Sequence, residues 1–459
     1  MKFVESLEKS AKEATMRKIY DLIDKDPEKN VDRIFYLAKK LVTDEDSKKG
    51  VEDVERYYHE MPSVKEFIQG VLKNTNPNCL KMFYQNFIGN AVWNGIPKRA
   101  KWMEKEDTKI PFVLLISPSM RCNLRCKGCY AATYPKDQGL KYEEVDKIVG
   151  QARDLGIHFI IVLGGEPFFV DYMWRIYEKY NDIEFVPFTN GSLFTEEVAD
   201  KLVKLGNIMP MFSLEGFEKE TDARRGKGTF KKVMEGMELL KSRGIPFGVS
   251  SATSTHNIDT VTSDDFIDML IEKGSKMSWY FIYMPVGDKP DVKDMLTPKQ
   301  RIELGRRTRK IRTTKPYFTI DFFNDAPYVG GCIAGKFYCH INSNGDVEPC
   351  IFAHIAKDNA KDKDLIDIFR GPLFKELRSR QPYNKNMLLP CMMIDNPDVI
   401  REISEKVNAY PTDESGKAML KDDDFHEKLE KLAKDFTPYA EEAWKEDFNS
   451  KGNDKFSRG

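Results

Sequence analysis

Residues 112–129 decide how this sequence is interpreted. They contain a short apolar run, Phe112-Val-Leu-Leu-Ile-Ser117, and then three cysteines in the stretch Cys122-Asn-Leu-Arg-Cys126-Lys-Gly-Cys129. The run predicts a buried strand, so the C-x3-C-x2-C spacing falls on the loop that leaves this strand. Three thiolates can hold three irons of a [4Fe–4S] cube and leave the fourth iron open. Zinc is the alternative metal, although it needs a fourth ligand and no histidine lies nearby.

An alternation of apolar runs and amphipathic segments continues beyond this loop. It predicts strands near 112–117, 158–163, 184–189, 208–213, 246–251 and 279–284. Repeated β–α units indicate a parallel sheet with helices outside. A full barrel needs eight such units, so the pattern predicts an α/β fold with a partial (β/α)6 TIM-type barrel that is open on one side. Active groups should then lie at the carboxyl ends of the strands.

The same pattern divides the chain into four regions. Residues 1–109 are expected to form a helical N-terminal extension, 110–312 the barrel core, 313–400 a small β-hairpin module and 401–459 a helical tail. The hairpin is indicated by Asn344-Gly345, a strong turn signal between two short apolar runs.

Composition limits the class of protein. The 459 residues are enough for two or more domains with cores of their own, and the net charge of −1 gives no field that would favour nucleic acid. The N-terminus has no apolar signal segment, and no stretch approaches the roughly 18 apolar residues of a spanning helix. We therefore expect a cytoplasmic protein, in which eight cysteines indicate metal binding or catalysis. Cys79 stands apart from the others and is expected to be a buried apolar thiol.

Glycine and polar residues follow several of the predicted strands. The second strand ends in Leu163-Gly164-Gly165-Glu166-Pro167, where two glycines free the backbone for close contact with a small ligand. The fourth ends in Ser213-Leu-Glu215-Gly216 and is followed by Asp222-Ala-Arg224-Arg225, and the sixth ends in Tyr283-Met-Pro285. Each fragment alone is also consistent with a solvated turn. Because the carboxyl ends of parallel strands meet at one edge, the fragments together predict a binding site there.

Taken with the cysteine loop, these motifs resemble the radical SAM superfamily over residues 110–310. The resemblance implies that the open iron is chelated by S-adenosylmethionine, held by residues at the strand ends: Gly164, Gly165, Glu166, Ser213, Glu215, Arg225 and Tyr283. The two glycines and Glu166 would contact the methionyl amino group, and Ser213 with Glu215 the ribose or the carboxylate. Arg224 or Arg225 would pair with the carboxylate, with a surface ion pair as the alternative. The backbone after the sixth strand would contact adenine.

The reaction implied by this resemblance is reductive. One electron passes from the cluster to the sulfonium, the S–C5′ bond breaks, and a 5′-deoxyadenosyl radical takes a hydrogen atom from an unactivated C–H position. The protein positions the reactants and excludes water, while the cofactor supplies the difficult chemistry. Flavodoxin or ferredoxin is the expected electron donor.

A second group of cysteines follows the barrel. The predicted hairpin turn is preceded by Cys332 and by Cys339, which lies on its first strand. Cys350 follows the turn, and Cys391 comes later. This spacing resembles the auxiliary-cluster modules called SPASM and twitch, although the further C-x2-C elements of a full SPASM pattern are absent from the sequence. The resemblance therefore implies one auxiliary [4Fe–4S] cluster, held by Cys332, Cys350 and Cys391.

Several alternatives stay open at this second site. Cys339 is either a fourth ligand or an inward apolar thiol, and His340 and His354 are weaker substitutes. Three ligands would leave an open iron for a substrate heteroatom, whereas four would favour transfer of an electron from the product radical. A zinc site in a small β-module is the remaining alternative.

The substrate is indicated by one segment of the N-terminal region. Residues 81–102 carry aromatic and aliphatic residues at helical spacing, followed by a cationic group and Trp102. Such a segment is typical of an interfacial membrane anchor, and the alternative is a helix packed on the outer face of the barrel. The chain also resembles a clostridial-type group of radical SAM proteins associated with joining fatty acyl chains into membrane-spanning lipids.

Three functional hypotheses follow. The first is modification or coupling of an unactivated C–H position on a lipid acyl chain, with peripheral membrane contact. The second is maturation of a peptide or protein side chain, although residues 1–109 do not resemble the winged recognition domain that peptide maturases often carry. The third is a non-catalytic iron–sulfur electron carrier, which would have no use for the S-adenosylmethionine motifs.

Overall fold

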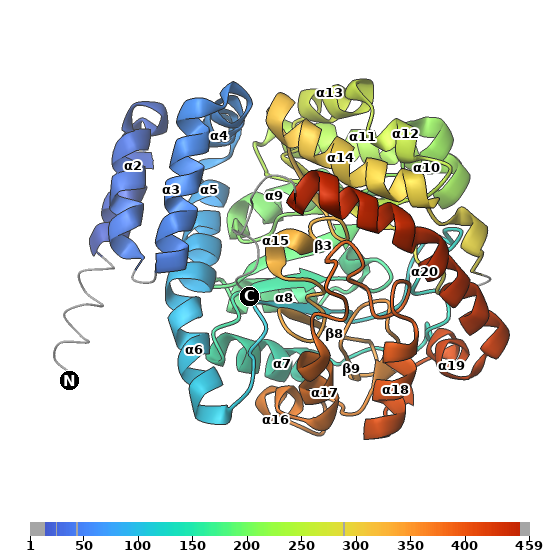
Figure 1. Cartoon of the computed structure of the whole chain (residues 1–459). Coiled ribbons are helices and arrows are strands. Elements are labelled where there is room, and N and C mark those ends of the chain that lie inside the picture. The colour runs from blue at the N-terminus through green and yellow to red at the C-terminus, as the bar shows by residue number, and fades with distance from the viewer. Residues whose placement is uncertain (1–13, 24, 43–44, 288–289, 450–459) are drawn as a thin grey trace.

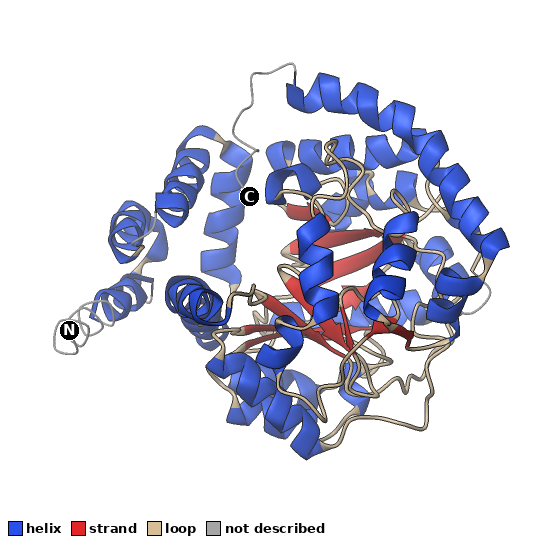
Figure 2. Ribbon diagram, turned by 60° about the horizontal axis from the view of Figure 1, so that its bottom comes forward, coloured by secondary structure: helices blue, strands red, loops and turns tan. Residues whose placement is uncertain are grey.

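The computed structural model describes residues 14–23, 25–42, 45–287 and 290–449 (Figure 1). The first residues of the predicted N-terminal extension and the last of the predicted tail lie outside this range. Figure 2 shows the strands gathered at the centre of the molecule, with helices on the outside.

Nine strands form the central sheet, in the order β7-β6-β5-β4-β3-β2-β1-β8-β9. Neighbouring strands from β7 to β8 are parallel, and β9 returns antiparallel to β8. β7 and β9 form the two edges of the sheet and do not pair with each other, so the barrel is incomplete. This confirms the predicted fold class. The strands are β1 (Val113–Ile116), β2 (Phe159–Val162), β3 (Glu184–Thr189), β4 (Met211–Ser213), β5 (Gly248–Thr253), β6 (Met277–Ile282), β7 (Phe318–Asp321), β8 (Tyr338–Ile341) and β9 (Val347–Glu348).

The structure adds two parallel strands to the six predicted. β7 pairs with β6, with Phe318 opposite Met277, and β8 pairs with β1, with Cys339 opposite Leu114. The predicted hairpin is present as β8 and β9. Its first strand is hydrogen-bonded into the barrel sheet, so the segment that carries the later cysteines continues the sheet of the cysteine loop.

Helices cover the outer face of the sheet. Local signals set their ends: the Thr195 side chain caps the first turn of α9, and Gly206 ends that helix with φ 72°, a conformation that favours glycine. The helices between the strands are α7 (Tyr142–Asp154), α8 (Met173–Lys179), α9 (Glu196–Leu205), α10 (Glu218–Arg225), α11 (Thr229–Ser242), α12 (Ile258–Val261), α13 (Asp264–Glu272) and α14 (Pro298–Thr314).

The core lies between this helical layer and the sheet. β2 reads Phe-Ile-Ile-Val, and its Ile160 and Val162 side chains, which share one face of the strand, are fully buried, while Ile161 on the other face lines the interior of the barrel. Burying one such side chain contributes about 1.5–3 kcal/mol. Cys79 is also fully buried in this core, as predicted.

The N-terminal helices form a separate layer on one side of the barrel (Figure 1). Phe87 packs edge-on against Phe112 and Phe159, with ring centroids 6.1 and 5.1 Å apart, and the buried Asn86 amide donates to the carbonyl of Asn181 at 2.9 Å. The aromatic segment 81–102 is therefore packed against the barrel, which is the second of the two interpretations given above. The elements are α2 (Pro27–Leu41), α3 (Glu45–Glu60), α4 (Pro62–Asn74), α5 (Pro77–Phe83), the π-helix η1 (Tyr84–Asn94) and α6 (Gly95–Glu106).

The C-terminal part adds further helices and the two-stranded sheet of β10 and β11. Its long helix α20 crosses the molecule next to α14 (Figure 1). Within the described residues, no helix combines the length and apolar character needed to cross a membrane. The elements are α15 (Ala326–Val329), β10 (Ile355–Ala356), α16 (Leu365–Phe369), α17 (Pro372–Arg380), α18 (Asp398–Val407), β11 (Tyr410–Pro411), α19 (Glu414–Lys421) and α20 (Asp423–Trp444).

Candidate active site

The cysteine loop lies beyond the carboxyl end of β1. Cys122 is exposed and Cys126 and Cys129 are half-buried, and all three line one large cavity. Gly128 adopts φ 61°, and a Cβ there would clash with the ring of Tyr283. Glycine at this position therefore lets the loop fold tightly beside the end of β6.

The two glycines after β2 pack directly against the backbone of the cysteine loop. Gly165 N donates to the Ser119 carbonyl at 2.9 Å, and a Cβ on Gly165 would overlap the carbonyl of Arg121. Gly164 adopts φ 109°, and a Cβ there would overlap the Ser119 carbonyl. Both glycines line the cavity, where their predicted contact with a methionyl amino group stays a prediction, and both also fix the backbone of the cysteine loop.

Glu166 is turned away from the cavity and is fully buried. Its carboxylate accepts hydrogen bonds from Thr189 Oγ1 and from the backbone N–H of Asn190, both at 2.8 Å. Burial raises the pKa of Glu166 to about 7, and these hydrogen bonds limit the rise. The side chain thereby positions Asn190, which lines the cavity and whose amide nitrogen lies 3.7 Å from Cys122 Sγ.

Glu215 forms a buried ion-pair group with two arginines. Arg225 Nε donates to Glu215 Oε1 at 3.0 Å, and Arg224 forms an ion pair with the same oxygen. Burial alone would raise the pKa of Glu215, but the two guanidinium groups outweigh it and hold the pKa below its ordinary value. The pairing is not a surface ion pair, which corrects that alternative. Arg225 also extends to 3.9 Å from Cys126 Sγ, so positive charge lies beside the cysteine loop.

Ser213, Tyr283 and the two arginines line the cavity on the same side as the cysteine loop. The structure therefore brings together the strand-end residues that the sequence predicts, with Glu166 and Glu215 behind them as supporting groups. The roles of the individual residues toward S-adenosylmethionine stay predictions.

Cys332, Cys350 and Cys391 converge on a second, smaller cavity of about 120 Å³. Burial raises the pKa of Cys332 to about 12 and also raises that of Cys391, so these thiols stay neutral unless a cation binds. The hydroxyl of Tyr338 donates to Cys350 Sγ at 2.9 Å. Three convergent thiols with a hydrogen-bond donor to one sulfur fit an iron–sulfur cluster.

The alternative ligands at this second site are engaged elsewhere. Cys339 is fully buried in the core of the sheet and does not line the small cavity, so it is the inward thiol rather than a fourth ligand. His340 contacts Glu348 and Ser117, both at 2.7 Å, and thus uses both ring nitrogens. His354 likewise contacts Asp413 and a backbone carbonyl.

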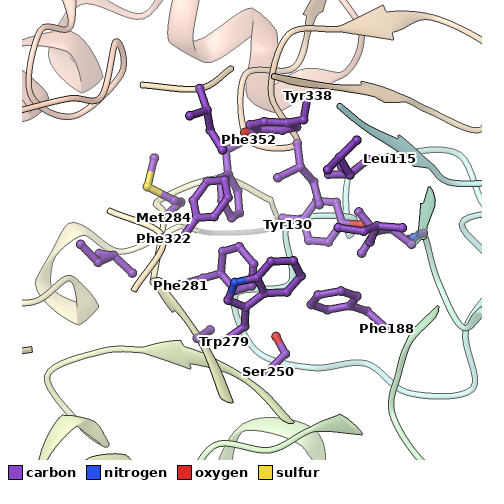
Figure 3. A pocket seen from close by; sticks show the side chains of 18 of the residues that line it. Leu115, Tyr130, Phe188, Ser250, Trp279, Phe281, Met284, Phe322, Tyr338 and Phe352 are labelled. Atoms are coloured by element: carbon purple, nitrogen blue, oxygen red, sulfur yellow. The ribbon is translucent and has the colours of Figure 1, made fainter. Parts of the chain in front are cut away.

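The large cavity has a volume of about 800 Å³ and runs through the interior of the barrel. Its walls are mainly aromatic, and Phe188 stacks on Trp279 with ring centroids 5.5 Å apart (Figure 3). Sequence analysis missed these residues, although Trp279 and Phe281 lie at alternate positions of β6 and so share one face of the strand. The aromatic residues in the wall are Phe112, Tyr130, Phe188, Trp279, Phe281, Tyr283, Phe322, Tyr328, Phe337, Tyr338 and Phe352.

Comparisons with known proteins agree with this geometry. The radical SAM superfamily profile matches residues 116–271, and the iron–sulfur cluster-binding SPASM profile matches residues 332–392. An AdoMet-dependent heme synthase of Methanosarcina barkeri is 25% identical over 304 residues, which cover 59% of this chain and 86% of that protein. The mycofactocin maturase MftC of Mycolicibacterium smegmatis is 26% identical over 290 residues, covering 59% of this chain and 73% of that protein.

A solved structure shares the fold. SuiB of Streptococcus suis, crystallised with S-adenosylmethionine, superposes with a TM-score of 0.54 at 22% identity and covers 64% of this chain and 74% of that one. The matches confirm the resemblance to the radical SAM superfamily, the enzyme class and the cofactors, namely the [4Fe–4S] cluster, S-adenosylmethionine and an auxiliary iron–sulfur site. They do not show the resemblance to the group that joins fatty acyl chains. Residues 116–271 therefore form a radical SAM domain, and residues 332–392 form a SPASM iron–sulfur cluster-binding domain.

Proposed function

We propose that this enzyme abstracts a hydrogen atom from an unactivated C–H position of a substrate that lies in the barrel cavity, and thereby modifies or couples that carbon. One observation carries the proposal: the same cavity is lined by the cysteine loop and by the aromatic wall. The cofactor end and the substrate region are thus one continuous space, so a substrate carbon can approach the cofactor directly.

The chain's own residues position the reactants. When bound, the cluster and S-adenosylmethionine supply reductive cleavage of the sulfonium and a carbon radical that takes the hydrogen atom. Gly164 and Gly165 offer a cavity wall without side chains, and Ser213 offers a hydroxyl group. Glu215 holds Arg224 and Arg225 at the cavity wall, where their remaining N–H groups can bind a carboxylate. A flavodoxin or ferredoxin would deliver the electron.

The aromatic wall protects the reaction from water. Phe188, Trp279 and Phe281 present rings to the cavity where a substrate would lie (Figure 3). Apolar walls expel water and suppress side reactions of a reactive species. They also favour a substrate whose reacting part is apolar.

The relatives support a peptide or protein substrate better than the lipid acyl chain expected from the sequence. MftC is named as a maturase, and SuiB was also crystallised with a precursor peptide, SuiA. An apolar or aromatic side chain of such a peptide would fit the aromatic wall. The packing of residues 81–102 against the barrel also removes the segment that suggested a membrane anchor.

A lipid acyl chain is the second candidate, and the length of the cavity favours it. The lining extends from the cysteine loop to Phe112, just before the amino end of β1. Five residue steps separate Phe112 from Ser117, or about 17 Å. An extended peptide would need about five residues to span this length, and each backbone polar group left unpaired there would cost about 2–7 kcal/mol. A hydrocarbon chain carries no such groups.

Two measurements test the proposal. Full-length protein reconstituted with iron and sulfide should form 5′-deoxyadenosine from S-adenosylmethionine in the presence of dithionite. Mass spectrometry of both peptides and lipids from cells with and without the gene should then show one product class that disappears with the gene. Absence of 5′-deoxyadenosine from cluster-loaded protein would overturn the proposal.

A further inference from the structure

Three cations line the end of the large cavity that lies away from the cysteine loop. Arg99 belongs to α6, Lys109 precedes β1, and Lys336 precedes β8. No aspartate or glutamate occurs among the described residues that line this cavity. The other two cations of the lining, Arg224 and Arg225, share the carboxylate of Glu215 at the opposite end.

Neither lysine has a carboxylate partner. Within the described residues, no ion pair is formed by Lys109 or Lys336. Burial, followed by the positive charge of Lys109, lowers the pKa of Lys336. Two ammonium groups thus line one end of an apolar cavity that has no carboxylate among its described lining residues, an arrangement that a bound anion would complement.

Arg99 adds a third charge but is held by the protein. It is buried, donates to the carbonyls of Ala91 and Gly156, and lies over the ring of Phe112 at 4.9 Å. The two lysines therefore keep N–H donors for a ligand, with the Lys336 ammonium 5.0 Å from the centroid of the Phe337 ring, and Arg99 contributes to the positive potential behind them.

The lysines lie where the cavity meets solvent. Lys109 is exposed, and so is Phe337, which follows Lys336 in sequence and lines the same cavity with an exposed fraction of 39%. An exposed aromatic ring beside cations at the mouth of an apolar cavity matches the boundary between the head and the chain of an amphiphile.

We propose that Lys109 and Lys336 bind the anionic head group of an amphiphile whose extended hydrocarbon chain runs through the cavity toward the cysteine loop. The inference rests on the proposed function and selects its second candidate, the acyl chain. The head group is a carboxylate or a phosphate, and both would be bound by ammonium groups in the same way. Positive charge at one end and the cofactor at the other would set which carbon of the chain lies next to the radical.

Binding of a fluorescent 18-carbon polyene carboxylate to the full-length, cluster-loaded protein tests the head-group contact without turnover. We expect the acid to bind about tenfold more tightly than its neutral methyl ester, which is the effect of about 1.4 kcal/mol. The double variant Lys109→Ala/Lys336→Ala should lose this preference and keep its affinity for the ester. The matched control is Lys101→Ala/Lys105→Ala, which removes two charges from α6 outside the cavity and should behave like the wild type.

The outcomes separate the alternatives. The proposal would be overturned if the wild-type protein bound acid and ester equally. It would also be overturned if Lys109→Ala/Lys336→Ala weakened the binding of both equally. A hexadecyl phosphate that binds with the same lysine dependence supports it and identifies phosphate as a suitable head. A ten-residue apolar peptide that binds through its C-terminal carboxylate, while the fatty acid does not bind, would overturn it in favour of a peptide.

A chain-length series tests the apolar part independently of any variant. Each added methylene should strengthen binding roughly fourfold until the chain fills the cavity, after which the affinity should level off. Val113→Phe, which narrows the cavity beside Phe112, should shorten the chain at which this levelling occurs. Affinity that does not change between 8 and 16 carbons in the wild-type protein would overturn the proposal.

Failure of this inference and of the proposed function are distinguishable. The lysine variant leaves the cofactor end intact, so it should still form 5′-deoxyadenosine. Production of 5′-deoxyadenosine without amphiphile binding would overturn the head-group site alone. Amphiphile binding by a protein that never forms 5′-deoxyadenosine would overturn the proposed function and leave the binding site in place.

Discussion

Cys122, Cys126 and Cys129 come from one continuous loop, whereas Cys332, Cys350 and Cys391 come from three separate segments. The first three face a wide cavity, with the guanidinium of Arg225 near Cys126. The second three enclose a small cavity and receive a hydrogen bond from the hydroxyl of Tyr338. The loop therefore offers one side to a cofactor, and the second site is enclosed by the fold.

The two sites also share a wall. Phe322, Tyr338 and Phe352 line both cavities, so the second site lies behind the aromatic wall of the first. This arrangement suits a division of labour in which cofactor cleavage depends on the loop and completion of the product depends on the second site.

Cys126→Ala should have the largest effect. It removes one of three ligands from the open loop, and no described histidine or carboxylate lies there to replace it. We expect 5′-deoxyadenosine formation to fall to background, as measured by liquid chromatography of anaerobic reactions. Normal yield from this variant would contradict the assignment of the loop.

Cys350→Ala should separate the two sites. Because Cys350 lies behind the aromatic wall, the loop should stay intact and 5′-deoxyadenosine should still form, while the final product should be lost. Iron analysis should show that only part of the iron has gone, and Cys79→Ala, which alters a buried thiol that lines neither cavity, provides the control. Product formed at the wild-type rate would mean that the second site is only structural.

Gly165→Ala should weaken the loop without removing a ligand. Its new Cβ would overlap the backbone carbonyl of Arg121, and such overpacking typically costs about 1–3 kcal/mol. We expect a lower melting temperature together with reduced iron content. Gly70→Ala is the matched control, because its nearest neighbour would be 3.9 Å away and alanine favours a helix by up to about 1 kcal/mol. Equal melting temperatures for the two variants would contradict this role of Gly165.

Glu166 should make stability depend on pH. Burial raises its pKa from 4.5 to about 7 in the folded protein, so the fold binds this proton more tightly than the unfolded chain does. Its contribution to stability is therefore complete below about pH 4 and is lost as the pH rises through 7, an effect of about 3 kcal/mol. Thermal melting between pH 5 and 8 should show a steeper fall for the wild-type protein than for Glu166→Gln. Parallel curves would show that the carboxyl titrates normally.

The sequence alone predicts much of this arrangement, and the limits have a physical origin. The loop cysteines and the strand-end glycines are close in sequence, so their grouping follows from local spacing. The pairing of β8 with β1 joins segments more than two hundred residues apart and leaves no local signal. For the same reason, only the fold shows that the Glu166 side chain points away from the cavity and that Glu215 pairs with two arginines. Only the fold also shows that Arg99, Lys109 and Lys336 line one end of the cavity.

The place of β8 beside β1 has a consequence for dissecting this enzyme. β1 donates and accepts ladder hydrogen bonds on both sides, with β2 on one flank and β8 on the other. A truncated protein that stopped before residue 338 would leave the strand that carries the cysteine loop as a bare apolar edge, open to pairing with other chains. The barrel and the auxiliary module are therefore expected to behave as one inseparable folding unit, and attempts to graft either half onto another protein should transfer both.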